Sequence, residues 1–99
     1  MGNRFDLIGD MKSFMRPHGG DFKEWYVGAS LDPHATLFET HKVIKTSDNW
    51  IYLVAESAET AKEVVSHFTD VLGTRGDLEK LPKDAHFVYA YKMAKTTTP

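Results

Sequence analysis

The chain has 99 residues, which is enough for one domain and too few for a second hydrophobic core. It contains no cysteine, so disulfides and thiolate metal sites are excluded, and its apolar runs are far shorter than the ~20 residues of a membrane span. The net charge of −2 argues against a protein that holds nucleic acid through a strongly basic surface. The N-terminus has no signal-peptide pattern, and we expect a cytoplasmic protein without a membrane partner.

The first predicted element is an amphipathic helix over Asn3–Met15. Its larger apolar side chains recur three or four residues apart, at Phe5, Ile8, Met11 and Met15. Asn3 is placed to cap the first turn, and Pro17 ends the pattern. Gly9 weakens the helix, because glycine in a helix interior costs ~1 kcal/mol relative to alanine. We expect this helix to pack on a sheet.

A strand, a turn and a second helix follow. Phe22–Ser30 is rich in aromatic residues and predicts the first strand. Asp32 can cap the free N–H groups of a helix that has Pro33 in its first turn. The helix continues over His34–His41 and ends there.

The second half of the chain predicts two strands around one long helix. Trp50–Ala55 is mostly apolar, which favours a central strand that is covered on both faces. Ser57 is placed to cap a helix over Ala58–Leu72, which has the most regular apolar period of the chain, and Gly73 supplies its C-terminal stop. After a polar loop, the alternation of Phe87–Met93 predicts the last strand.

The order α–β–α–β–α–β is compatible with parallel βαβ units and with an antiparallel or mixed sheet. We favour an α+β fold in which a small three-stranded, mainly antiparallel sheet is flanked by about three helices. The chain then forms a single domain, with an N-terminal helix in residues 1–16, the sheet and the other helices in 22–93, and a flexible tail in 94–99.

The segment around the first turn carries the only chemical motif of the chain. Trp25-Tyr26-Val27-Gly28, followed by Asp32-Pro33 and a helix that closes with His41, resembles the second half of the GIY-YIG nuclease signature. The similarity covers roughly residues 22–72. It implies a GIY-YIG-like domain whose family chemistry is the hydrolysis of DNA phosphodiesters.

The resemblance also implies roles for particular residues. In that family, a tyrosine at the position of Tyr26 lies near the attacking water and the scissile phosphate. A glutamate on the later helix, here Glu63, holds one divalent metal ion such as Mg²⁺, which stabilises the developing charge. An arginine about ten residues after the tyrosine pairs with the phosphate. Tyr26 and Glu63 are therefore candidate catalytic residues, and Glu63 is the candidate metal ligand.

The chain departs from the family pattern at two points. Thr36 stands where the arginine is expected, and no lysine or arginine occurs between Lys23 and Lys42. The Gly-Ile-Tyr strand is also absent, since Met15–Gly20 cannot form a comparable strand. Because the loss of one such charge-stabilising donor typically costs ~10²–10³ in rate, efficient cleavage is not expected.

One topology would restore part of the site. If the last strand pairs beside Trp25–Gly28, it brings Tyr89 or Tyr91 close to Tyr26, in the place of the missing tyrosine. Tyr89 and Tyr91 are therefore additional catalytic candidates. A last strand that lies elsewhere in the sheet would contradict this hypothesis.

Further polar groups near the motif are candidates for substrate binding: Thr36, His41, Lys42 and Lys45. His41 and the two lysines form a short basic patch after the second helix. The simpler interpretation of Glu63 is a solvated helix residue, and that of Tyr26 is a partly buried sheet residue.

Three functions remain open. The preferred one is a divergent GIY-YIG-like domain that is catalytically impaired, has no cofactor and acts as a binding or interaction module. The second is an active Mg²⁺-dependent DNA endonuclease, and the third is an unrelated small α+β protein-interaction domain. The possible partners are accordingly nucleic acid or another protein. On the family interpretation, Tyr26, Thr36 and Glu63 must line one concave surface.

Overall fold

The computed structural model describes residues 3–18, 21–44, 46, 49–76, 78 and 81–98. Its elements follow in the order α1 (Arg4–Met15), η1 (Arg16–His18), η2 (Phe22–Glu24), β1 (Trp25–Ser30), α2 (Pro33–Ala35), η3 (Thr36–Thr40), β2 (Trp50–Val54), α3 (Ala58–Ser66), η4 (His67–Leu72) and β3 (Phe87–Lys92). The η3 and η4 segments are π-helical continuations of α2 and α3. No helix among the described residues is long and apolar enough to cross a membrane.

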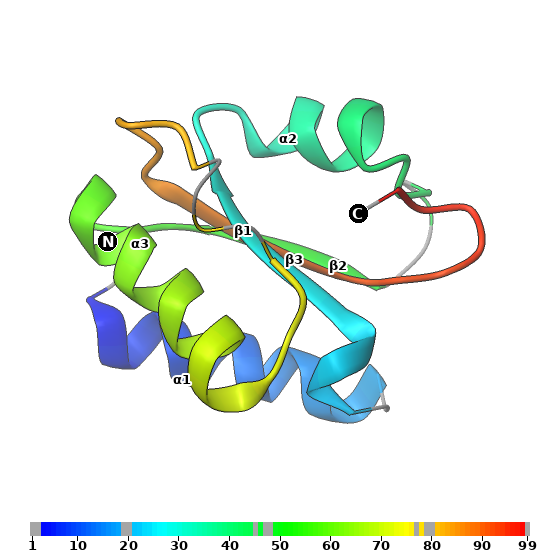
Figure 1. Ribbon diagram of the computed structural model, residues 1–99, viewed down its shortest axis with the longest axis horizontal. Coiled ribbons are helices and arrows are strands. Elements are labelled where there is room, and N and C mark those ends of the chain that lie inside the picture. The colour runs from blue at the N-terminus through cyan, green and yellow to red at the C-terminus, as the bar shows by residue number, and fades with distance from the viewer. Residues whose placement is uncertain are drawn as a thin grey trace.

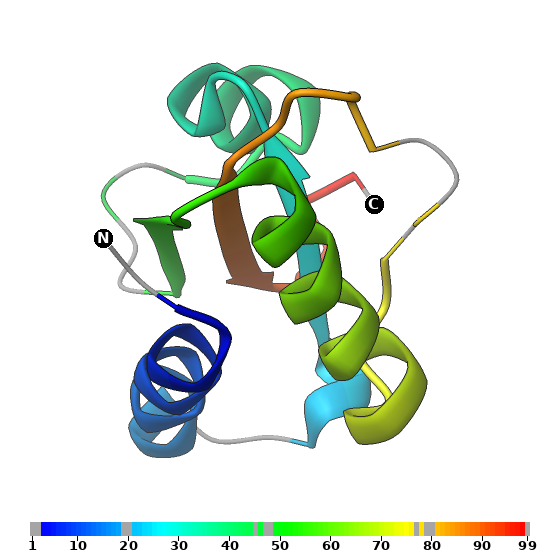
Figure 2. The ribbon, with the colours of Figure 1, turned by 90° about the vertical axis from the view of Figure 1, so that its left-hand side faces the viewer.

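The three strands form one antiparallel sheet in the order β1-β3-β2. Helices α1 and α3 lie on one face of this sheet and α2 lies on the other, as the two views show (Figure 1 and Figure 2). The predicted α+β fold with a small, three-stranded antiparallel sheet is confirmed.

The register of the sheet aligns side chains in rows across the three strands. Alternate residues of a strand point to opposite faces, so each row lies on a single face. The rows on the α2 side run from β1 through β3 to β2 as Tyr26–Tyr91–Trp50, Gly28–Tyr89–Tyr52 and Ser30–Phe87–Val54. This face of the sheet is therefore largely aromatic.

Each helix begins where the sequence supplies a cap. Asn3 accepts a hydrogen bond from the Asp6 N–H, Asp32 from Ala35 and Ser57 from Thr60. These bonds satisfy N–H groups that have no partner within the helix. Gly73 ends the α3–η4 helix with φ of 87°, a left-handed conformation that glycine adopts without steric cost.

Two apolar clusters occupy the two faces of the sheet. The larger cluster joins α1 and α3 to the sheet, with Met11, Trp25 and Phe68 among its fully buried side chains. The smaller one joins the α2–η3 segment to the sheet and is centred on Leu37 and the tyrosines of β3. Burial of such large side chains stabilises a chain of this size by roughly 1.5–3 kcal/mol each.

The predicted central position of Trp50–Ala55 is wrong. β3 is the central strand, and β2 is an edge strand in which Tyr52 is 39% and Val54 37% exposed. An apolar run indicates that a strand is favourable, but it does not indicate which strand receives partners on both sides. The alternation in Phe87–Met93 is typical of a strand with one face in water, so it did not indicate that β3 is covered on both faces.

The ends of two other predicted segments also differ. The first strand begins at Trp25, because Phe22–Glu24 forms a 3-10 turn in which the Asp21 N–H donates to the Glu24 carboxylate at 2.8 Å. At the C-terminus, the Thr98 N–H donates to the carbonyl of His41 at 2.7 Å. The sequence pattern did not indicate this contact of the tail with the domain.

The outer edge of β1 is covered by the segment after η4. Val27 N–H donates to the Arg75 carbonyl at 2.9 Å, and Arg75 N–H donates to the Trp25 carbonyl at 2.8 Å. Gly76 allows this close approach, because a Cβ at that position would lie 2.5 Å from the Val27 carbonyl oxygen. The segment acts as a short parallel strand beside β1.

Two glycines provide a matched test of this packing. We expect Gly76→Ala to lower the free energy of unfolding by about 1–3 kcal/mol, because backbone must move away from β1. We expect Gly9→Ala to raise it by about 1 kcal/mol, since a Cβ on this exposed helix residue meets nothing within 4 Å. Urea denaturation of the two variants and the parent chain measures both effects. Equal effects of the two substitutions would contradict the close approach at Gly76.

Candidate functional site

A pocket of about 530 Å³ lies between β1 and the α2–η3 segment, beside the covering Arg75 segment. Its polar lining residues are Tyr26, Ser30, Thr36, Thr40, His41, Arg75 and Tyr89. The volume is within the range of ~300–1,000 Å³ that is usual for small-molecule sites. We take this pocket as the candidate site.

An aromatic cluster forms one wall of the pocket. The ring of Tyr26 lies 4.7 Å from that of His41, and it stacks on Tyr91 at 5.4 Å and Tyr89 at 6.3 Å between centroids. Tyr91 is fully buried beneath this surface, whereas Tyr26 is only partly buried. The strand register explains the stack, because Tyr26 is directly opposite Tyr91.

The predicted condition on topology is therefore met. β3 pairs with β1 along its whole length and brings two tyrosines to the neighbourhood of Tyr26. A catalytic role for these tyrosines stays a prediction.

His41 is held by hydrogen bonds on both ring nitrogens. Nδ1 lies 2.7 Å from the Thr98 carbonyl oxygen, and Nε2 lies 2.8 Å from the Tyr89 hydroxyl. Because a carbonyl oxygen can only accept, Nδ1 carries the proton, and the Tyr89 hydroxyl donates to Nε2. Burial lowers the pKa of His41, opposed by the bond to Thr98, so the imidazole is neutral at pH 7.

The buried tyrosines of β3 are poor sources of a phenolate. Burial is the main cause that raises the pKa of both Tyr89 and Tyr91 above the ordinary value of 10.0, and the neighbouring Tyr26 raises both further. A tyrosine that acts as a base or nucleophile needs the opposite shift. Their arrangement is suited to packing and hydrogen bonding.

The hydroxyl of Thr36 is committed to the turn before α2. It donates to the Asp32 carbonyl at 2.9 Å and lies 2.6 Å from the Ser30 hydroxyl, which therefore donates to it. The Ser30 oxygen in turn accepts from the Asp32 N–H at 3.0 Å. Thr36 thus fastens the turn and has no proton left for a ligand.

Gly28 of the Tyr-Val-Gly motif makes room for Tyr89. Its cross-strand partner is Tyr89, and a Cβ on Gly28 would lie 2.5 Å from the phenolic oxygen. The tyrosine ring therefore passes over the β1 backbone and reaches His41. The motif glycine serves the packing of this pocket.

Arg75 is a cationic residue in the lining of the pocket. It belongs to the segment that covers β1, lines the pocket and is exposed. Its guanidinium is close enough to Tyr91 to oppose the rise in pKa of that phenol. Of the described residues that line the pocket, none carries a carboxylate, and Arg75 has no ion pair with any described acidic side chain.

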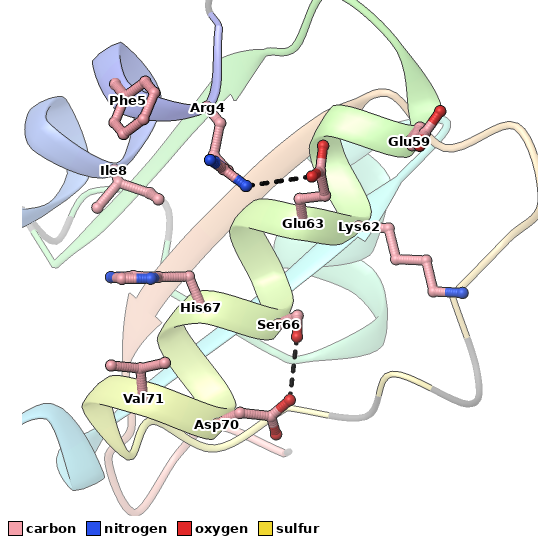
Figure 3. Close-up of a pocket in the computed structure, with 10 residues that line it drawn as sticks. All are labelled: Arg4, Phe5, Ile8, Glu59, Lys62, Glu63, Ser66, His67, Asp70 and Val71. Atoms are coloured by element: carbon pink, nitrogen blue, oxygen red, sulfur yellow. Dashed lines mark hydrogen bonds and ion pairs between the residues drawn. The ribbon is translucent and has the colours of Figure 1, made fainter.

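Glu63 lies away from this pocket, in a groove between α1 and α3 on the other face of the sheet. There it forms an ion pair with Arg4 at 3.2 Å, and both side chains are 46% exposed (Figure 3). The prediction that Tyr26, Thr36 and Glu63 line one surface is wrong for Glu63. A regular helical period on α3 buries Val64 and Val65 against the sheet and turns Glu63 outward.

The basic patch after the second helix is only partly described. Lys42 is exposed and has φ of 60°, the left-handed conformation in which the chain turns after η3, but it does not line the pocket. Lys45 lies outside the described residues. Within the described part of the chain, no group of three or more acidic or histidine side chains is placed to hold a metal ion.

Sequence reasoning missed Arg75 and Thr98, which reach the site from distant segments. Arg75 follows Gly73 and precedes Gly76 in a polar loop, and nothing local indicates that this loop adds to the sheet.

Comparisons of the chain with protein-family models, with curated proteins and with solved structures found no match. The likeness to GIY-YIG nucleases therefore stays a prediction from the motif, and the position of Glu63 on the other face of the sheet counts against it.

The lowered pKa of His41 predicts a pH dependence of stability. Below about pH 6.5 the unfolded chain binds a proton that the folded chain resists, so the free energy of unfolding falls as the pH is lowered towards the folded pKa. We expect His41→Gln to make this dependence shallower, because glutamine does not titrate. Denaturant unfolding between about pH 8 and about pH 5 measures it. His34→Gln, at an exposed position of α2, is the matched control, and an equal change in both variants would contradict the assignment.

Proposed function

We propose that this protein is a non-catalytic binding module that holds a phosphate group of a nucleotide or nucleic acid in the pocket beside Tyr26. The observation that carries the proposal is the guanidinium of Arg75, which has no ion pair with a described acidic side chain, in a pocket without described acidic residues. An arginine can bind a phosphate through two parallel N–H···O bonds, which gives both affinity and orientation.

The remainder of the pocket is compatible with such a ligand. Tyr26 offers a partly buried aromatic ring beside the cation, and Thr40 offers an exposed hydroxyl. The neutral His41 adds no negative charge. An anion in this pocket therefore meets one positive charge and no described opposing one.

Three features argue for binding without hydrolysis. Glu63, the proposed metal ligand, pairs with Arg4 in another pocket. The raised pKa values of Tyr89 and Tyr91 disfavour phenolate chemistry. Thr36, which replaces the family's arginine, uses its hydroxyl within the turn. The proposal therefore needs only the pocket, and it holds equally for a diverged nuclease and for an unrelated domain.

We expect Arg75→Ala to weaken the binding of adenosine monophosphate by about 10–100-fold, because hydrogen bonds to charged groups contribute roughly 1.5–3 kcal/mol. Isothermal titration calorimetry with adenosine monophosphate, inorganic phosphate and uncharged adenosine measures the effect. Arg75→Lys should retain part of the affinity, since the charge remains and the paired geometry is lost.

The matched control is Arg16→Ala, which removes the same charge from an exposed residue that does not line this pocket. It should leave the affinity almost unchanged at physiological salt. Equal weakening by both substitutions, or no binding of any phosphate compound, would contradict the proposal.

An active Mg²⁺-dependent endonuclease is the second candidate, and one observation favours it. The pairing of β3 with β1 brings Tyr91 opposite Tyr26, and Arg75 lies nearby. The tyrosine pair is the one that the sequence analysis anticipated, and Arg75 comes from a segment that it did not anticipate. The distant Glu63 leaves the metal ion without its expected ligand.

We expect supercoiled plasmid to remain intact when it is incubated with the protein and Mg²⁺ or Mn²⁺, as judged by agarose electrophoresis. Nicking that is lost in Glu63→Ala would contradict the preferred function. Nicking that persists in Glu63→Ala and Arg75→Ala would point to a contaminating nuclease, and repetition with freshly purified chain would then decide.

A further inference from the structure

The outer edge of β2 presents main-chain groups that point away from the sheet. Lys92 N–H donates to the Asn49 carbonyl, and Ala55 N–H donates to the His86 carbonyl. The main-chain N–H and C=O groups of the odd-numbered residues of β2 therefore point towards β3. The N–H and C=O groups of Tyr52 and Val54 therefore face outward. In the described part of the chain, no main-chain hydrogen bond reaches these two residues from the outer side.

The two edges of the sheet differ in this respect. The β1 edge is closed by the Arg75 segment, through bonds of 2.8 and 2.9 Å. β2 is the outermost strand at the other edge of the sheet (Figure 2). Proteins usually protect such an edge with lysine, proline, a bulge or a very short strand.

β2 has none of the protecting residues. Its five residues, Trp50–Val54, contain no charge, no proline and no glycine, and they pair regularly with β3. Tyr52 and Val54 are 39% and 37% exposed. An uncharged, exposed edge strand of this kind is a template for another β-strand.

We propose that the occupant of this edge is β2 of a second copy of the chain, paired antiparallel about Tyr52. The main-chain N–H and C=O groups of Tyr52 point outward from the sheet edge. In the dimer, they form two reciprocal N–H···O bonds with Tyr52 of the other copy across the two-fold axis. The two sheets then join into one continuous six-stranded sheet, in the order β1-β3-β2-β2-β3-β1.

The sequence of β2 is self-complementary in this register. On the α2 side, Tyr52 lies beside its own copy and Trp50 beside Val54, and on the other side Ile51 lies beside Leu53. A two-fold axis always opposes identical residues, so a charge at its centre would repel itself. The uncharged centre of β2 meets this requirement, whereas a different protein as partner would not need it.

The pairing also has a geometric consequence for the pocket. Antiparallel neighbours in one sheet are related by an axis perpendicular to it, so the α2 faces of both copies lie on the same side. The two pockets would open on one surface of the dimer.

We expect the parent chain to sediment as a dimer in equilibrium ultracentrifugation, and Tyr52→Lys to raise the dimer dissociation constant by about tenfold or more, because like charges oppose each other at the axis. Val71→Lys is the matched control, since Val71 is 68% exposed on η4, away from β2. A parent chain that stays monomeric at about 1 mM, or a dimer that Val71→Lys dissociates and Tyr52→Lys does not, would overturn the proposal.

A cysteine substitution tests the register directly, because the chain has no native cysteine. Hydrogen-bonded antiparallel partners have Cα atoms about 5.5 Å apart, which is within disulfide range. Mild oxidation should link Tyr52→Cys into a covalent dimer and leave Val71→Cys largely unlinked. Equal linking of both variants would overturn the register. Circular dichroism checks the fold of every variant, and the parent chain's sedimentation decides alone if the variants are unfolded.

Discussion

The central strand β3 is the element on which the other parts of the structure depend. Its alternating side chains serve two different environments: Val88 and Ala90 are buried towards α1 and α3, and Tyr89 and Tyr91 point towards α2. Hydrogen bonds on both sides of the strand align these residues with β1 and β2. One strand thereby sets the main core and the wall of the pocket, and β2 is left as an edge strand of the sheet.

The pocket depends on contacts between residues that are far apart in the sequence. Gly28 on β1 allows Tyr89 on β3 to pass over the backbone, and Tyr89 then bonds to His41 at the end of η3. Thr98 completes the arrangement on the other nitrogen of the imidazole. Each contact joins segments that are tens of residues apart, so the pocket forms only when the sheet is complete. The neutral histidine and the protonated tyrosines form an uncharged wall of the pocket, and Arg75 lines it beside them.

Local sequence patterns predicted the elements well. The caps at Asn3, Asp32 and Ser57 each depend on a side chain and an N–H only three residues away, and so they are encoded locally. The helical period of Ala58–Leu72 correctly predicted a continuous helix, although its second half is wider than an α-helix. Patterns of this kind also predicted the class of fold. They did not indicate that Trp50–Ala55 lies at an edge of the sheet, because the number of strands that pair with a given strand is not a local property of its sequence.

The candidate site was only half determined by the sequence. Tyr26, Gly28 and the Asp32-Pro33 turn lie within a few residues of each other, so their motif could be recognised, and Tyr26 lines the pocket. Only the tertiary structure decided that Glu63 faces the opposite side of the sheet and that Arg75 enters instead. The physical reason is that side-chain orientation on α3 follows from burial of its apolar stripe, while the position of Arg75 follows from pairing with the β1 backbone. The apolar stripe is itself a local pattern, but the face of the sheet that it covers and the pairing of the Arg75 segment depend on contacts between distant segments.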